Sequence, residues 1–144
     1  MINNIKEILE GNLESEDIFF ELTNYVMDKG IEEGVDSLSE DEKYLFMVLK
    51  MLMEVNNGGF HQYFLNTDGV YSKDTLHFLN LIKETNFSNL LNKSINIFEM
   101  KITDDEKIHN LNELDSEFYE FDEDIYKSLY EKCVDYIKDS LRNA

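Results

Sequence analysis

Apolar residues recur at intervals of three and four along most of the chain, which is the period of a helix buried on one face. The clearest case follows Ser39, where Leu45, Val48 and Leu52 share a face. Ser39 and Glu42 have the spacing of a capping box, so we expect a helix to begin at residue 40. No segment alternates convincingly as a β-strand does. The pattern predicts an all-α fold of about seven or eight helices, over residues 3–10, 16–29, 40–55, 59–65, 73–85, 89–100, 104–113 and 122–141.

A backbone break followed by an aromatic face stands after residue 55. The break is expected at Gly58 and Gly59, because paired glycines permit positive φ and a sharp change of direction. Beyond it come Phe60, Tyr63 and Phe64, at i, i+3 and i+4, so they form one face of a second, short helix. We expect these aromatic rings to point inward.

The polar residues of this segment have two interpretations. In one, a small pocket is lined by Asn57, Gln62 and Asn66, with the Tyr63 hydroxyl as a further polar group and the glycines admitting a ligand close to the backbone. In the other, the amides satisfy backbone groups left unpaired where the helix breaks. We favour the structural interpretation.

The chain is strongly acidic, with 31 acidic residues against 13 basic ones and a formal charge of -18 on 144 residues. Such a charge repels nucleic acid and anionic membranes, so we expect neither as a direct partner. With 42% hydrophobic residues the chain has enough apolar mass for one packed core, and its length suits a single domain over residues 1–144. One cysteine, Cys133, allows no internal disulfide. We find no signal peptide and no apolar run long enough to span a bilayer, so we expect the protein in the cytoplasm.

The charge lies mainly at the two ends, with formal sums of -10 for residues 1–59, zero for 60–101 and -8 for 102–144. Carboxylates at helical spacing predict two partner-binding stripes, an N-terminal one of Glu14, Asp17 and Glu21 and a C-terminal one of Glu113, Glu117, Glu120, Asp124, Glu131 and Asp135. Like charges at i, i+4 cost a helix about 0.2–0.5 kcal/mol per pair, so a function would explain why such stripes are kept. The alternative is a solvated face that only aids solubility.

The break motif also carries a resemblance, together with a second, weaker motif. The residues are Glu54-Val55-x-Asn57-Gly58-Gly59-Phe60-x-Gln62-Tyr63-Phe64-x-Asn66, and then Leu114-Asp115, Phe118 and Tyr136-Ile137. This pattern resembles the bacterial domain-of-unknown-function family 4375, also called DNA-mimic-protein-like, over about residues 38–137, with residues 1–37 as additional N-terminal helices. The resemblance implies an all-helical domain that inhibits a DNA-binding protein by imitating nucleic acid. It implies no catalytic residues.

Charge density sets a condition on such mimicry. A chain of 17.0 kDa exposes about 7,700 Å², or roughly one net charge per 430 Å², whereas duplex DNA carries roughly one per 100 Å². Evenly spread acidity is therefore about fourfold too dilute. Mimicry requires the two acidic ends to meet on one surface, which a homodimer would extend.

Catalytic and metal-binding signatures are absent from the sequence. The histidines His61, His77 and His109 are far apart, and only Asp105 and His109 share a helical face. We therefore expect no metal, no cofactor and no enzymatic activity. The leading hypothesis is an acidic domain that binds a basic protein, as a DNA mimic on a DNA-binding protein. The alternatives are an immunity protein that neutralises a basic bacterial toxin, and a small-ligand module at residues 57–66.

Overall fold

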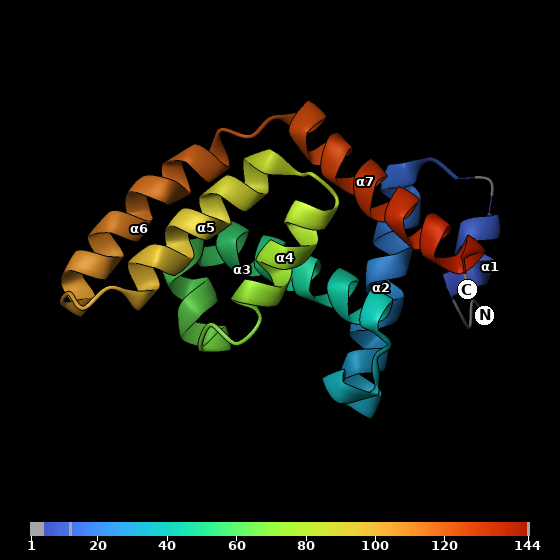
Figure 1. Ribbon diagram of the computed structural model, residues 1–144, viewed down its shortest axis with the longest axis horizontal. Coiled ribbons are helices and arrows are strands. Elements are labelled where there is room, and N and C mark those ends of the chain that lie inside the picture. Colours follow the sequence, from blue (N-terminus) through green and yellow to red (C-terminus); the bar gives the residue numbers. More distant parts are fainter. Residues whose placement is uncertain (1–4, 12, 144) are drawn as a thin grey trace. The chain divides into compact units, whose positions relative to one another are not determined.

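The computed structural model describes residues 5–11 and 13–143, and all regular structure in these residues is helical (Figure 1). The prediction of an all-α fold is thereby confirmed. Within the described residues there are seven α-helices and one short 3₁₀ segment: α1 (Ile5–Glu10), α2 (Ser15–Glu33), η1 (Val35–Ser37), α3 (Glu40–Thr67), α4 (Ser72–Leu81), α5 (Thr85–Glu99), α6 (Asp104–Tyr119) and α7 (Glu123–Arg142). None of these helices is long and apolar enough to cross a membrane.

Several predicted boundaries differ from the observed ones. The spans 40–55 and 59–65 are the two halves of α3, and the span 104–113 ends too early because Leu114 and Phe118 continue the buried face of α6. The span 73–85 runs too far, since α4 ends at Leu81 and Lys83 adopts a positive φ of 59°. The span 89–100 begins late, as α5 starts at Thr85. Residues 3 and 4 of the first predicted span lie outside the described residues.

The chain divides into two compact units. The terminal unit comprises Met1–Phe46 with Glu123–Ala144, and the central unit comprises Met47–Asp122. The helix α3 begins in the terminal unit and continues into the central one. The expectation of one domain over residues 1–144 stays a prediction.

The terminal unit is held together by α2 and α7, which pack against each other (Figure 1). Leu22 and Val26 of α2 are fully buried, as is Cys133 of α7. The rings of Phe19 and Tyr130 lie 4.5 Å apart between centroids. Each fully buried aliphatic or aromatic side chain contributes about 1.5–3 kcal/mol, so these contacts fix which faces of α2 and α7 point outward.

The start of α3 also belongs to the terminal unit and has the predicted capping box. The Ser39 amide donates to Glu42 Oε1 at 2.8 Å, and the Glu42 amide donates to Ser39 Oγ at 3.2 Å. Lys29 Nζ of α2 lies 3.1 Å from the same carboxylate oxygen. Burial raises the pKa of Glu42, but the bonds from Ser39 and Lys29 outweigh it and the net pKa is lowered.

The central unit has an aromatic core beneath three helices. α5 packs against both α4 and α6 (Figure 1). Phe60 of α3 meets Phe118 of α6 edge-on at 5.8 Å, and Phe64 of α3 stacks on Phe98 of α5 at 4.5 Å. These rings point inward as expected, and they fix the second half of α3 against α5 and α6.

Candidate functional site

The break in α3 lies at the two glycines that the sequence indicates. Gly58 has φ -154° and ψ 18°, and Gly59 has φ 80° and ψ 179°. The conformation of Gly59 is in a region that is essentially restricted to glycine. The second half of α3 therefore begins as a new helix at Phe60.

This new helix start is capped from a distant part of the sequence. The Phe60 amide donates to Asp115 Oδ1 of α6 at 2.8 Å. A Cβ atom on Gly59 would overlap the Asp115 carboxylate, so residue 59 must be glycine for steric reasons as well. Burial raises the pKa of Asp115, although the Phe60 amide and the nearby His61 act in the opposite direction.

The end of the first half of α3 is capped from α6 as well. The Tyr119 hydroxyl donates to the Val55 carbonyl at 2.8 Å. Val55 lies in the last turn before the break, where the carbonyls of a helix commonly need partners from outside it. Both sides of the break are thus held by residues of α6.

The Glu54 carboxylate of α3 accepts hydrogen bonds from two side-chain amides of the motif. Glu54 Oε2 accepts from Gln62 Nε2 at 2.9 Å and from Asn66 Nδ2 at 2.7 Å, and Lys50 Nζ lies 3.3 Å from Oε1. Burial raises the pKa of Glu54, yet these bonds outweigh it and the net pKa is lowered. Gln62 also covers Gly58, where a Cβ atom would overlap its side chain. The Gln62 and Asn66 amides are therefore bound to Glu54 rather than to the backbone groups of the break, whereas the neighbouring Asn56 amide donates to the Leu52 carbonyl at 2.8 Å.

The predicted pocket is present only in part, because Asn57 and Gln62 line an open hollow with Glu54, whereas Tyr63 and Asn66 do not line it. Tyr63 is fully buried, and burial raises the pKa of its hydroxyl to about 12, with Thr75 of α4 as a neighbour that partly offsets the shift. Asn57 is exposed to solvent. The contacts of Gln62 and Asn66 are internal to the motif, but they join side chains and do not satisfy the backbone groups of the break as the structural interpretation expected.

The sequence reasoning missed the roles of Glu54, Asp115 and Tyr119 at this junction. Two of these residues, Glu54 and Asp115, stand inside the motifs that carry the family resemblance. Their presence there was the available signal, but their partners lie too far along the chain for helical spacing to reveal them.

The predicted C-terminal stripe is divided between two helices. Glu113 and Glu117 lie on α6 and Glu120 is its C-cap, whereas the other three residues, Asp124, Glu131 and Asp135, lie on α7. Residues 120–122 between the helices are not helical. The first three residues belong to the central unit and the others to the terminal unit.

The α6 part forms one exposed row. Glu113, Glu117 and Glu120 stand at intervals of four and three on the face opposite the buried Leu114 and Phe118. Glu117 and Glu120 lie at the C-terminal end of the helix, where the macrodipole disfavours negative charge by about 0.3–1 kcal/mol per group. Overall, α6 contains six carboxylates and one lysine, a formal charge of -5.

The N-terminal stripe lies on α2, and exposed carboxylates continue it toward the C-terminal end of that helix. Glu14 is the N-cap of α2, and it shares one face with Asp17 and Glu21. Asp28, seven residues after Glu21, and then Glu32 lie on the same face and are exposed. Extending the three-and-four spacing along the sequence would have found both residues. The helix contains six carboxylates and one lysine, so its formal charge is also -5.

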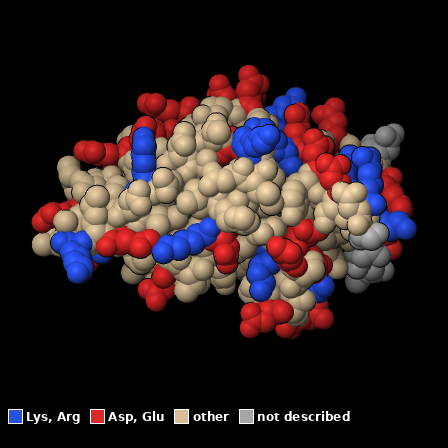
Figure 2. Space-filling view, in the orientation of Figure 1, with Lys and Arg blue, Asp and Glu red and all other residues tan. Residues whose placement is uncertain are grey.

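The α7 part is different, because basic residues accompany it. Asp124, Glu131 and Asp135 share an exposed face, but α7 has five carboxylates and four basic residues and a formal charge of -1. Figure 2 shows lysine and arginine side chains among the carboxylates over this helix, whereas the surface over α5 is mostly uncharged. That the two acidic ends meet on one surface stays a prediction.

The histidines His61, His77 and His109 lie on three different helices, α3, α4 and α6. No group of three or more histidine, cysteine, aspartate or glutamate side chains in this part of the chain is arranged to hold a metal ion. His109 Nε2 lies 3.7 Å from Glu113 Oε1, which places an ion-pairing partner beside the acidic row whenever the imidazole is protonated.

Comparison with known families matches residues 36–140 to the family model described as DMP19-like protein. The chain belongs to the DMP19-like family. The DNA-mimic type of family that the two motifs indicate is thereby confirmed, whereas the number 4375 stays a prediction. No curated protein and no solved structure matches the chain significantly.

The DMP19-like region covers only part of the acidic residues. It includes the break of α3, the row on α6 and most of α7. The α2 row, which contains Glu14, Asp17 and Glu21, precedes residue 36 and lies outside it. Within the family region, the α6 row is therefore the carboxylate row with the least basic compensation.

Proposed function

We propose that this chain binds a basic protein, and that it does so as a DNA mimic that occupies the DNA-binding surface of its partner. The proposal rests on one observation, the exposed row of Glu113, Glu117 and Glu120 on α6 inside the family region. Membership in the DMP19-like family supports the same function. We expect the protein to act in the cytoplasm, where DNA-binding proteins are found.

The spacing of the row suits this role. Carboxylates three or four residues apart on a helix are about 5–6 Å apart at Cβ, close to the distance between phosphates along a strand. A partner with lysine and arginine side chains placed for phosphates would therefore meet acceptors at similar intervals.

The cost of the row to the helix argues against an incidental surface. Glu113 and Glu117 repel each other at i, i+4, and the macrodipole opposes carboxylates at this end of α6. Lys or Gln at these positions would remove both costs and still be soluble. The presence of glutamate at all three positions is what a requirement for negative charge would produce.

The proposal is tested in two steps. The wild-type protein first captures basic partners from its native cell at low salt, and high salt should release them, because charge complementarity accelerates association and is screened by ions. Each captured partner is then loaded with a fluorescent DNA duplex, and its displacement by the full chain is followed by anisotropy. Displacement of the duplex is the expected result.

The decisive comparison uses two triple variants of equal net charge. In the row variant, Glu113, Glu117 and Glu120 become lysine; in the control, three exposed carboxylates outside the rows become lysine, namely Asp36, Asp74 and Glu99. The row variant should lose displacement by at least about tenfold while the control stays near wild type. Equal behaviour of the two variants, with both still folded by circular dichroism, would refute the role of the row.

The same experiment distinguishes a DNA mimic from an immunity protein. A captured partner that keeps its DNA while the chain inhibits its nuclease activity would be a toxin neutralised by its immunity protein. That result would retain a basic protein as partner and overturn DNA mimicry.

A further inference from the structure

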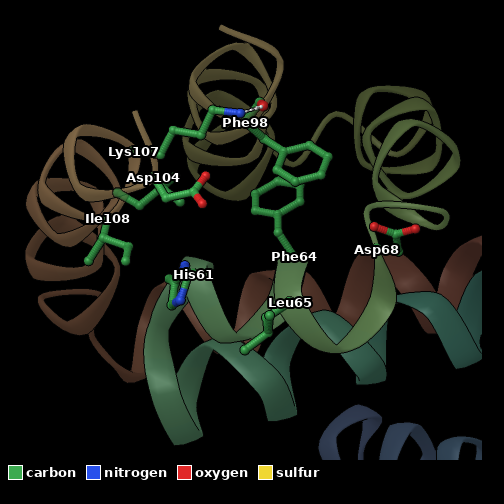
Figure 3. Close-up of a pocket in the computed structure, with 9 residues that line it drawn as sticks. His61, Phe64, Leu65, Asp68, Phe98, Asp104, Lys107 and Ile108 are labelled. Carbon is green, nitrogen blue, oxygen red and sulfur yellow. Dashed lines mark hydrogen bonds between the residues drawn. The ribbon is translucent and has the colours of Figure 1, made fainter. Parts of the chain in front are cut away.

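A pocket of about 330 Å³ lies within the central unit, between the second half of α3, the end of α5 and the start of α6 (Figure 3). Its inner wall is the stacked pair Phe64 and Phe98, and Ile108 of α6 adds a half-buried aliphatic side. Leu65 stands at the pocket with 70% of its surface exposed. This volume is at the lower end for ligand sites and suits a single long side chain rather than a large cofactor.

The charges around this pocket are not balanced. Lys107 directs its ammonium to the Phe98 carbonyl at 2.8 Å, and the same nitrogen lies 5.6 Å from the centre of the Phe98 ring. Lys107 is thus used to cap the end of α5, and it makes no ion pair with Asp104 among the described residues. Figure 3 shows the Asp104 carboxylate turned toward the space in front of Phe64.

Two further ionisable groups line the pocket. His61 rises from α3 on the side opposite Phe98, and Asp68 lies on the far side of Phe64 from Asp104 (Figure 3). The pocket therefore combines an apolar interior with two carboxylates, one histidine and one lysine whose ammonium is bound to the Phe98 carbonyl. An occupant with an apolar stem and a cationic head fits both properties.

We infer that this pocket receives one arginine side chain of the basic partner, with its aliphatic stem against Leu65 and Ile108 and its guanidinium at Asp104. The inference rests on the proposed function, because it assigns an anchoring contact to the same class of partner. Arginine is preferred over lysine because a guanidinium is more weakly hydrated than an ammonium and pairs with a carboxylate through two parallel hydrogen bonds. Anchors of this kind, placed in a pocket, commonly dominate protein interfaces.

The test uses the full chain with isotope-labelled isoleucine and leucine methyl groups. The probe is the peptide acetyl-Gly-Arg-Gly-amide, and methyl NMR shifts of Leu65, Ile108 and Leu111 are followed during its titration. Saturable shifts with a dissociation constant on the order of 1 mM are expected for a single side chain. The same peptide with citrulline, which has the arginine shape without the charge, should give no saturation.

Asp104→Asn and Asp105→Asn form a matched pair of variants. Both residues lie in the first turn of α6 and affect the helix dipole alike, but only Asp104 lines the pocket. The arginine peptide should bind Asp104→Asn about threefold to tenfold more weakly than wild type, and Asp105→Asn as wild type does. Equal binding of the arginine peptide by the two variants, or equal binding of the arginine and citrulline peptides by the wild type, would overturn the inference.

Failure of this inference can be told apart from failure of the proposed function. If the α6 row variant loses the captured partner while Asp104→Asn still displaces DNA as wild type does, the pocket is not an anchor and the mimic proposal stands. If the row variant keeps wild-type displacement, the mimic proposal fails whatever the peptide titration gives.

Discussion

The replacement of Gly59 by alanine tests the account of the α3 break most directly. Two costs are expected. Gly59 has φ 80° and ψ 179°, a conformation that costs a residue with a Cβ atom about 1–3 kcal/mol. The new methyl group would also overlap the Asp115 carboxylate and displace it from the Phe60 amide, a capping bond worth about 0.5–2 kcal/mol. Together these predict that Gly59→Ala lowers the free energy of unfolding by about 1.5–5 kcal/mol.

The measurement is urea unfolding followed by far-UV circular dichroism, with Gly34→Ala as the matched control. Gly34 has φ 91°, but a Cβ atom there would touch nothing within 4 Å, so this variant carries the backbone cost alone. Gly59→Ala should therefore be the more destabilised of the two. The double variant Gly59→Ala/Asp115→Ala should be less destabilised than the sum of the single variants, because the overlap is gone. A loss at Gly59 no larger than at Gly34, or full additivity with Asp115, would refute this account.

Two further predictions concern hydrogen bonds of the described residues. Glu42→Gln should lower the free energy of unfolding at neutral pH by about 1–3 kcal/mol, because the ionised carboxylate binds Lys29 and Ser39. The pKa of Glu42 is lower in the folded state than its unfolded value of 4.5, so its contribution to stability is present above pH 4.5 and is lost as pH falls through the folded pKa. The difference in unfolding free energy between Glu42→Gln and wild type should therefore shrink in acid. A difference that persists in acid would contradict this assignment. Tyr119→Phe should lower the free energy of unfolding by only about 0.5–1 kcal/mol in the same assay, because Tyr119 is 53% exposed and water can replace its hydrogen bond to the Val55 carbonyl. A loss above about 2 kcal/mol would mean that the hydroxyl does more than cap that carbonyl.

Local patterns along the chain predict the helices better than their ends. The capping box of Ser39 and Glu42 and the glycine pair at 58 and 59 are short-range signals, and the structure has a helix start and a helix break at those places. By contrast, α4 ends without a glycine, since Lys83 itself adopts the positive φ that usually marks a helix end. No local rule predicts that a lysine takes this conformation.

The junction at the motif was only partly predictable for a related reason. The break follows from two adjacent glycines, but the contacts that stabilise it come from distant residues. The Asp115 carboxylate is 55 residues from the Phe60 amide that it binds, and the Tyr119 hydroxyl is 64 residues from the Val55 carbonyl. Such contacts depend on how α6 packs on α3, which periodicity within one helix does not contain. The carboxylate rows are the opposite case. Their membership follows from spacing alone, whereas the basic residues that offset α7 are seen only when each helix is considered as a whole.

The capped start of the second half of α3 has a consequence for ligands. A glycine-rich bend that leads into a helix is where many nucleotide-binding proteins hold a phosphate, because free amides and the positive end of the helix gather there. Here the chain supplies that anion itself, through Asp115. A phosphate would have to expel this internal carboxylate before it reached the amide of Phe60. The amide after the glycine pair is therefore already bound within the protein, and a mononucleotide added to the protein should not bind there.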